Sequence, residues 1–391
     1  MSEIKVNSIK GVSATSAAIS INNTDGTCTA NLTNNLSNRN AIVNGGCLVA
    51  QRGTSSASAD FASVDRMKLS VTNMDQLAWL QKQSDDAPDG FQKSWEFDVT
   101  TAESALDADD LVYMRYAVEA QDLTPFFNAN GTGKDFILSF YVKAYQTGTY
   151  QISIFQLSNS SRFITKTYTI AQSGVWQRIE LAYTGDTNQS GFSADNAIGF
   201  QIAFQLIAGS NYTSGGQVTN WGGFGNSHFA AGQAVNVGSS TDNYWKITGI
   251  QLELDQGSGK ATDFEHRSYP HELMQCERYY QLIAPSVAEA LISDTVDYDN
   301  TTYFTCDLHT PMRIAPSLVV GNHTDAFRLY GTNPRNVNTL LANTGVTTTS
   351  KILLYATGGS SGSVGFARVF KNTSGNQSGG TYATIAVNAE L

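Results

Sequence analysis

Closely spaced aspartates are the residues of this sequence whose type and spacing could most readily do chemistry. Two carboxylates in one site can serve a glycosidase as acid and as base or nucleophile, and several together can hold Ca²⁺ through their oxygens. The spacing of a calcium-binding loop, with its central glycine and terminal glutamate, is absent. We therefore expect solvated loops, with calcium binding and catalysis as the alternatives for the first two clusters. The clusters are Asp85, Asp86 and Asp89; Asp107, Asp109 and Asp110; and Asp294, Asp297 and Asp299.

Two histidines, His266 and His271, are the next candidates because they lie five residues apart. A zinc site would need two more donors in a convergent geometry. Glu265 and Glu272 are the nearby carboxylates, but this spacing matches no usual zinc site, so a structural junction is favoured. The sequence also lacks the motifs GxSxG, GxxxxGK[ST] and HExxH. We expect no catalytic residue, no metal and no cofactor, and hence a protein that is not an enzyme.

A long polar loop at 209–228 has the composition of a glycan-binding surface. Tyr212, Trp221 and Phe224 stand there among glycines and amides. Aromatic faces stack on the C–H surfaces of sugars, while Asn, Gln and Thr supply hydrogen bonds. These three aromatics are our candidate glycan-binding residues. A second interpretation, which we favour, is that the loop simply covers one edge of a sheet.

The charge and the apolar runs exclude several classes of partner. The chain has 391 residues, with 24 Lys and Arg against 34 Asp and Glu, for a net charge of −10. Nucleic-acid binding requires clustered Lys and Arg, and no basic run occurs. No stretch approaches 18 apolar residues and no apolar signal segment opens the chain, so we expect neither membrane insertion nor a signal peptide. The four scattered cysteines, Cys28, Cys47, Cys276 and Cys306, favour buried free thiols over two disulfides.

Alternating apolar residues predict strands from 41 to 267. In the segment 136–143, the side chains of Phe136, Leu138, Phe140 and Val142 would share one face. Many such strands without intervening helices predict a jelly-roll sandwich. The other clear strands are 149–155, 162–170, 175–183, 198–207 and 244–254.

The remaining segments predict three further parts. Residues 268–281 predict a short connector helix with Ser268 as N-cap and a stripe formed by Tyr269, Leu273, Cys276 and Tyr280. Residues 282–391 predict a C-terminal β-sandwich, with polar loops at 331–350 and 371–380. Its expected strands are 302–306, 317–320, 326–330, 352–355, 364–370 and 382–387.

Residues 1–40 predict an extended N-terminal arm. Two short alternating segments, 4–9 and 18–22, lie in a polar tract that is too poor in apolar residues to fold alone. We expect the arm to become ordered on another copy of the chain or on a larger assembly. A flexible tail is the alternative.

Several separated motifs resemble a family of tailed-bacteriophage virion proteins of the tail-fibre or receptor-binding type. The opening motifs are NRNAIVNGG at 38–46, QRGT at 51–54 and VDR at 64–66. The closing motifs are GIQLE at 249–253, ATDFEHRS at 261–268, CERYY at 276–280 and AEL at 389–391. The central segment also looks like the jelly rolls of carbohydrate-binding modules, in fold rather than in site. Within the motifs, we expect Arg52, Asp65 and Arg66 to form a buried ion pair that pins the first strand.

The resemblance implies a function. We expect a homotrimeric tail fibre or adhesin, made in the host cytoplasm and built into the virion. The arm would contact other virion proteins, and the C-terminal domain would contact a host cell-surface glycan through the loops 331–350 and 371–380. A capsid decoration or head-fibre protein is the alternative. A tailspike polysaccharide depolymerase is less well supported, because the chain shows no β-helix repeats.

Overall fold

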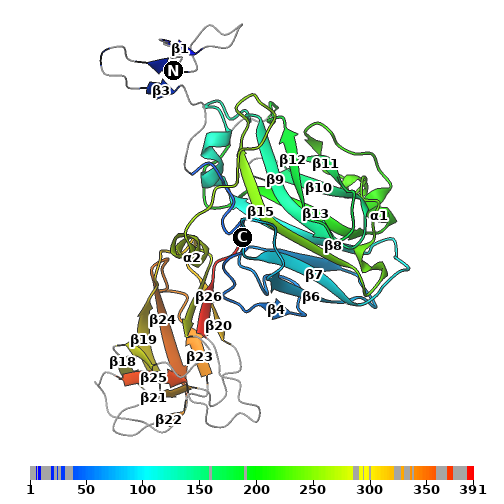
Figure 1. The fold of residues 1–391 in the computed structure, drawn as a ribbon. Coiled ribbons are helices and arrows are strands. Elements are labelled where there is room, and N and C mark those ends of the chain that lie inside the picture. Colours follow the sequence, from blue (N-terminus) through cyan, green and yellow to red (C-terminus); the bar gives the residue numbers. More distant parts are fainter. Residues whose placement is uncertain are drawn as a thin grey trace, which may run out of the picture.

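Strands dominate the computed structural model of this chain (Figure 1). The structure describes Val6, Thr24 and residues 8–9, 19–21, 28–30, 38–157, 161–188, 192–284, 290–293, 295–298, 301–320, 327–329, 335–336, 339–357, 368–372 and 385–391. Within these ranges, no helix is both long and apolar enough to cross a lipid bilayer. The all-β fold class predicted from the sequence is confirmed.

Two antiparallel six-stranded sheets form the central sandwich. We name each sheet after one of its central strands. The β13 sheet has the order β14 (Gly222–Gly223), β11 (Arg162–Ile170), β10 (Gly148–Gln156), β13 (Ile198–Ala208), β8 (Leu111–Glu119) and β5 (Lys68–Thr72). The β15 sheet has the order β12 (Gln177–Tyr183), β9 (Phe136–Ala144), β15 (Tyr244–Leu254), β7 (Ser94–Thr101), β6 (Ala78–Ser84) and β4 (Ser55–Ser56).

The alternation seen in the sequence fixes which face of each strand is buried. In β9, the side chains of Phe136, Leu138, Phe140 and Val142 are fully buried between the sheets. The strand pairs antiparallel with β15 and with β12, so that Phe140 lies opposite Ile179. The predicted strands at 149–155, 162–170, 198–207 and 244–254 match β10, β11, β13 and β15 to within one residue at each end.

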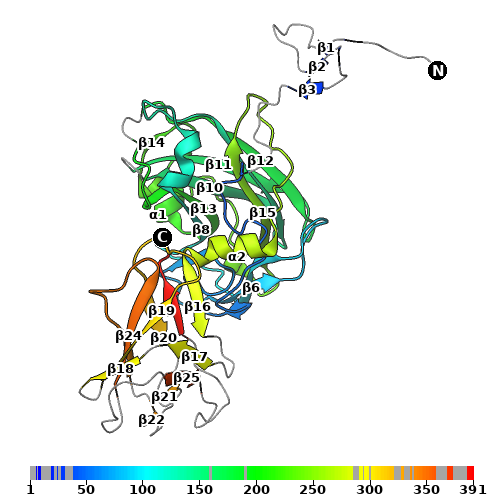
Figure 2. The ribbon, with the colours of Figure 1, turned by 90° about the vertical axis from the view of Figure 1, so that its left-hand side faces the viewer.

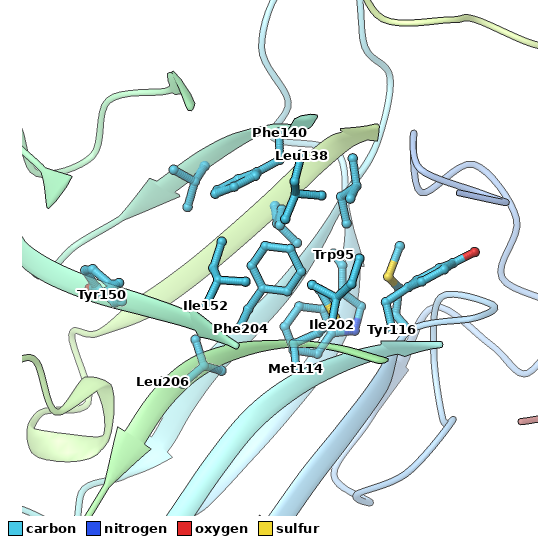
Figure 3. Packing of buried hydrophobic residues seen from close by; sticks show 14 of the residues in the cluster. Trp95, Met114, Tyr116, Leu138, Phe140, Tyr150, Ile152, Ile202, Phe204 and Leu206 are labelled. Carbon is cyan, nitrogen blue, oxygen red and sulfur yellow. The ribbon is translucent and has the colours of Figure 1, made fainter. Parts of the chain in front are cut away.

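Large aromatic and aliphatic side chains from both sheets fill the core (Figure 3). Trp95 of β7 and Trp245 of β15 are fully buried, with ring centres 6.1 Å apart. Phe204 of β13 reaches across the sandwich and packs edge-on against Phe140, with ring centres 5.2 Å apart. Burial of this continuous apolar surface is the main stabilising term for the sandwich.

Short helical turns connect some of the strands. The 3₁₀ turn η1 (Ala120–Phe126) follows β8 and buries Leu123 and Phe126. Three more turns lie in the long segment between β13 and β15. They are α1 (Ser210–Thr213), η2 (Asn226–His228) and η3 (Val237–Ser239).

The connector helix α2 (Tyr269–Glu277) lies between the sandwich and the C-terminal sheets (Figure 2). Pro270 occupies the first turn, where its missing N–H has no helical partner to lose. The predicted stripe is only partly right. Cys276 is buried, but Tyr269 is 53% exposed and Glu272 is buried in its place, because the helix faces a polar loop of the sandwich rather than an apolar surface.

The described residues of the C-terminal part, which we call the tip domain, form three antiparallel sheets. The predicted strands of this part lie within or overlap β19, β20, β21, β24, β25 and β26. A small core is formed by Phe304, Leu308, Met312, Leu340, Ile352, Leu354, Ile385 and Val387. The sheets are β16 (Tyr280–Ala284), β26 (Ile385–Asn388) and β20 (Ser317–Val320); β17 (Ala290–Ser293), β25 (Arg368–Asn372), β21 (Phe327–Leu329) and β22 (Arg335–Asn336); and β18 (Thr295–Tyr298), β19 (Thr301–Asp307), β24 (Lys351–Thr357) and β23 (Thr339–Ala342).

The described part of the N-terminal arm forms a three-stranded sheet of its own. It contains β1 (Ser8–Ile9), β2 (Ile19–Ile21) and β3 (Cys28–Ala30), which pair in that order. This sheet stands apart from the sandwich in both views (Figures 1 and 2). Val6 and Ile9 are 41% and 53% exposed. The sequence predicts two of these strands and misses the third.

Cys47, Cys276 and Cys306 are free thiols; Cys47 and Cys276 are buried as predicted, whereas Cys306 is only partly buried. Burial raises the pKa of Cys47 to about 12, so this thiol stays protonated and unreactive at neutral pH.

Candidate functional site

Two of the three predicted glycan-binding aromatics lie on the outer face of the β13 sheet. Tyr212, in α1, is half-buried against a small apolar cluster that includes Phe155 and Phe163. Phe224 is 44% exposed, and its ring centre lies 5.2 Å from that of Phe155 and 5.5 Å from that of Phe163. These two side chains therefore contact the same cluster, and part of the Phe224 ring faces solvent.

Trp221 belongs to a different environment. Its ring packs against the main core, with its centre 6.1 Å from that of Phe200 and 6.5 Å from that of Phe136. Its Nε1 donates a hydrogen bond to the carbonyl oxygen of Thr184 at 2.6 Å. The short strand β14 separates Trp221 from Phe224, so the three aromatics do not form one platform.

The loop that carries these aromatics is tied to the outer face of the β13 sheet. The carbonyl oxygen of Phe229 accepts hydrogen bonds from Gln151, Ser153 and Gln205, at 2.8, 2.7 and 3.1 Å. All three donor side chains are buried. The loop thus covers part of the outer face of the sheet, and through β14, which pairs with β11, it also covers one edge of the sheet, as the sequence suggested. Glycan binding by Tyr212, Trp221 and Phe224 stays a prediction.

A hollow of about 240 Å³, which we call the junction pocket, lies beside α2 on the sandwich. It lies where three separate segments meet: the loop at Gly46, the turn at 90–92, and the stretch from Phe264 into α2. Its volume lies below the usual range for drug-sized ligands. It therefore suits a ligand of about one sugar ring.

Aromatic rings form one wall of the junction pocket. The ring centre of Phe91 lies 5.0 Å from that of Phe264 and 5.1 Å from those of His266 and Tyr141. The rings of Phe264 and His266 meet edge to face at 4.9 Å. These tilted contacts are the favourable ones for aromatic rings, so the rings of the wall stabilise one another.

Buried charges form the floor of the junction pocket. One carboxylate oxygen of Glu272 accepts a hydrogen bond from the backbone N–H of Asn44 at 2.7 Å, and the other lies 3.5 Å from Nη1 of Arg267. Arg267 also donates to the carbonyl oxygen of Ile42 at 3.0 Å. Its Nε is buried and has no partner within the described part of the chain. The floor is therefore a polar surface held in place by its own ion pair and backbone hydrogen bonds.

Neither predicted histidine gathers further metal donors around it. His266 belongs to the aromatic wall, and His271 lies half-buried on α2. Among the residues that the structure describes, no three His, Cys, Asp or Glu side chains come together as a metal site would need. The arrangement in the junction pocket offers aromatic faces for stacking and polar groups for hydrogen bonding.

The acidic cluster at 85–89 forms ion pairs rather than a carboxylate pair. Asp86 accepts hydrogen bonds from Nζ of Lys143 and of Lys246, at 2.9 and 2.8 Å, and from Nε1 of Trp176 at 3.1 Å. Burial alone would raise its pKa, but these donors outweigh burial and hold the pKa at about 2. Asp85 pairs instead with Lys93.

The cluster at 107–110 closes a turn. Asp110 accepts a hydrogen bond from the backbone N–H of Asp107 at 2.7 Å, and Asp109 accepts one from Asn73 at 2.6 Å. Burial raises the pKa of Asp110. In the third cluster, the side chains of Asp294, Asp297 and Asp299 lie outside the described residues.

A buried set of charges joins the sandwich to the tip domain, and we call it the junction lock. The guanidinium carbon of Arg66 lies 3.4 Å from the ring centre of Tyr279, and that of Arg52 lies 3.7 Å from the ring centre of Tyr280. Both arginines form ion pairs with Glu390, at the end of the tip domain. Their side chains are only 1% and 10% exposed.

Asp65 completes the junction lock from the sandwich side. Its carboxylate accepts hydrogen bonds from the backbone and the side chain of Gln51 and lies 3.6 Å from Nη1 of Arg52. Burial raises its pKa to about 6 against the opposing effect of Arg52 and Gln51. The predicted buried ion pair is confirmed for Arg52 and Asp65. For Arg66 the partner is wrong, because Glu390 of the tip domain takes that place.

The motif residues are brought together although they are far apart in the sequence. The carboxylate of Glu265 accepts hydrogen bonds from the backbone N–H groups of Arg39 and Asn40, at 3.0 and 2.8 Å. The motifs at 38–46 and 261–268 therefore pack on each other, and those at 51–54, 64–66, 276–280 and 389–391 build the junction lock.

No model of a known protein family matches the sequence, and no curated protein matches it. Among solved structures, the chain is similar to the enzymatically active domain of tailspike protein 4 of bacteriophage CBA120. That match has 15% identity and a TM-score of 0.30, and it covers 56% of this chain but only 22% of the tailspike chain. A CBM4 structure matches with 11% identity and a TM-score of 0.27, covering 54% of this chain and 98% of its own. TmCBM61 in complex with β-1,4-galactotriose matches with 11% identity and a TM-score of 0.26, covering 56% and 99%.

Phe91 is the pocket residue that sequence reasoning missed. Phe264 and His266 belong to the motif ATDFEHRS, but Phe91 stands alone after Gly90. A large aromatic directly after a turn glycine was the available signal. It is a weak one, because single surface aromatics are common.

Proposed function

We propose that this chain is a non-catalytic structural protein of a tailed-bacteriophage particle, a homotrimeric tail fibre or adhesin that contacts glycans on the host surface. The observation that carries the glycan-contacting part is the junction pocket. Its aromatic wall and the polar groups of its floor are the two kinds of group that recognition of a sugar ring uses.

The placement of the motifs supports the virion part of the proposal. The segments that resemble phage virion proteins are those that hold the sandwich, α2 and the tip domain together. An adhesin has to hold its tip firmly relative to its body, and buried ion pairs stacked on aromatic rings supply such a rigid joint.

The N-terminal sheet supports the homotrimer. An isolated sheet of two- and three-residue strands is too short to be stable alone in water. Its exposed Val6 and Ile9 offer apolar surface that another copy of the chain would cover. A trimer would also multiply weak glycan contacts into firm attachment.

Three measurements on the full chain test the proposal. Light scattering should give three times the mass of the 42.1 kDa chain, and a sharp monomer at micromolar concentration would overturn the trimer. A glycan array should show binding to host-surface glycans, and incubation with host polysaccharide should release no oligosaccharide. Release would instead indicate a depolymerase.

Antibody labelling of intact particles decides the position of the protein. We expect label on the tail. Label distributed over the capsid would replace the fibre with a decoration or head-fibre protein, and unlabelled particles would overturn the virion assignment.

A further inference from the structure

Two tyrosines lie side by side on the outer face of one tip-domain sheet. Tyr303 of β19 and Tyr355 of β24 are directly opposite each other in the antiparallel register. Their ring centres are 6.0 Å apart, with an angle of 33° between the ring planes. The next pair in register, Phe304 and Leu354, is buried in the core of the tip domain. Because side chains alternate along a strand, the two tyrosines face away from that core.

The turn that follows β23 closes the space above these tyrosines into a hollow. The hollow has a volume of about 400 Å³ and is lined by Tyr303, Tyr355, Ala342, Asn343 and Thr344. Leu341, which is 42% exposed, lies opposite Tyr355 in the register and extends the apolar surface across a third strand.

Hydrogen bonds fix the turn in place. The backbone N–H of Asn343 donates to the carbonyl oxygen of Leu353 at 2.8 Å, and the hydroxyl of Thr347 donates to the carbonyl oxygen of Asn343 at 2.8 Å. The side-chain oxygen of Asn343 accepts from Gly345 N–H at 3.2 Å. Within the part of the chain that the structure describes, its amide nitrogen has no protein partner and remains a donor for a ligand.

The chemistry of the lining selects the ligand. Two aromatic faces suit the C–H surface of a pyranose ring, and an amide, a threonine hydroxyl and two phenol groups can bond its hydroxyls. Among the described residues of the tip domain, no charged side chain lines the hollow, so a carboxylate there would lose hydration without gaining a partner from them. We propose that this tyrosine pair binds an uncharged hexose or N-acetylhexosamine of a host glycan. This inference rests on the contact with host glycans proposed above.

Saturation-transfer NMR and titration calorimetry on the full chain test this inference. The probes are methyl glycosides of glucose, galactose and mannose, N-acetylglucosamine, and glucuronic acid as the charged comparison. We expect the tip to bind at least one neutral sugar and to bind glucuronic acid more weakly. Tyr355→Ala and Tyr303→Ala should each weaken the neutral sugar by roughly tenfold, whereas Tyr355→Phe, which keeps the ring, should stay within about threefold.

Tyr145→Ala is the matched control, since Tyr145 is a 48% exposed tyrosine of the sandwich and lines neither hollow. Circular dichroism melts of every variant check that the tip domain remains folded. If neutral sugars bind and both alanine variants bind them as the parent does, the inference is overturned while the adhesin proposal stands. If no glycan or sugar binds at all, the glycan contact itself fails. If the variants change only the oligomeric mass, the tyrosine surface is an interface between copies and the inference is overturned.

Discussion

Arg66 and Glu390 form a buried ion pair across 324 positions of the sequence, and the guanidinium of Arg66 lies against the ring of Tyr279 at 3.4 Å. The same guanidinium donates to the carbonyl oxygen of Ala117 in β8 at 2.7 Å. One side chain thus connects the sandwich, the short segment between α2 and β16, and the last residues of the tip domain.

Arg66→Ala should lower the free energy of unfolding by about 3 kcal/mol, because removing one partner of a buried pair leaves the other charge uncompensated. Urea denaturation followed by tryptophan fluorescence measures this change. The control is Lys351→Ala, which removes an ion pair with Asp307 whose side chains are 64% and 78% exposed. Lys351→Ala should lower the free energy of unfolding by less than about 1 kcal/mol. Equal effects of the two substitutions would show that the lock contributes little.

The pH dependence of stability should include a contribution from Asp86. Its pKa of about 2 in the folded protein lies below the ordinary value of 3.8 for an aspartate. Its stabilising effect is therefore fully present above about pH 4 and is lost as the pH falls toward 2. The difference in melting temperature between the parent and Asp86→Asn should be largest near pH 5 and should shrink as the solution is acidified.

Asp85→Asn is the matched control for Asp86, since the Asp85 side chain is 87% exposed. Its melting temperature should follow that of the parent at every pH. A difference between the parent and Asp86→Asn that stays constant from pH 5 to pH 2 would rule out the ion-pair explanation.

Gly249→Ala should destabilise the sandwich and disturb the junction pocket. Gly249 has φ +63°, and a Cβ there would lie 2.7 Å from Phe91 and 2.9 Å from Tyr141. We expect a loss of about 1–2 kcal/mol from the left-handed backbone alone. Gly216→Ala meets nothing within 4 Å and should change stability by less than about 0.5 kcal/mol. Thermal denaturation of both variants measures the contrast, and a neutral Gly249→Ala would refute it.

Glycan binding at the junction pocket should depend on its aromatic wall. Phe264→Ala should weaken binding of the glycan found on the array by roughly tenfold, since a stacked ring contributes about 1 kcal/mol beyond the area it buries. Surface plasmon resonance on immobilised glycan measures the change. Unchanged affinity would remove the junction pocket as a binding site.

The earlier sequence candidate is tested in the same assay with Phe224→Ala. Phe224 is exposed and belongs to the outer face of the β13 sheet, so this substitution should fold normally and leave binding at the junction pocket intact. Loss of binding in Phe224→Ala but not in Phe264→Ala would transfer the site to the loop at 209–228.

The strands were predictable from sequence because alternation is a local property. In β9, every second residue from Phe136 is apolar, and the buried face follows from that pattern. The position of Trp221 was not predictable. It lies three residues from Phe224, and only the pairing of β14 with β11 places the two side chains in different environments.

Contacts between distant segments account for the rest of what sequence reasoning missed. The predicted partner of Arg66 is wrong because nothing in the sequence around the motif VDR at 64–66 indicates a contact with Glu390. The junction pocket was not predicted because Phe91 comes from a different loop than Phe264 and His266. The motifs indicate which segments of the sequence are important, but they do not indicate which residues those segments contact.

The junction lock also limits how tips can be exchanged between related proteins. A tip domain transplanted by cutting after α2 would bring its own final residues against Arg52 and Arg66 of the recipient. Chimeras should therefore assemble only when the donor carries an aromatic pair like Tyr279 and Tyr280 and an acid like Glu390, so that a tip domain can be replaced only together with these matching residues.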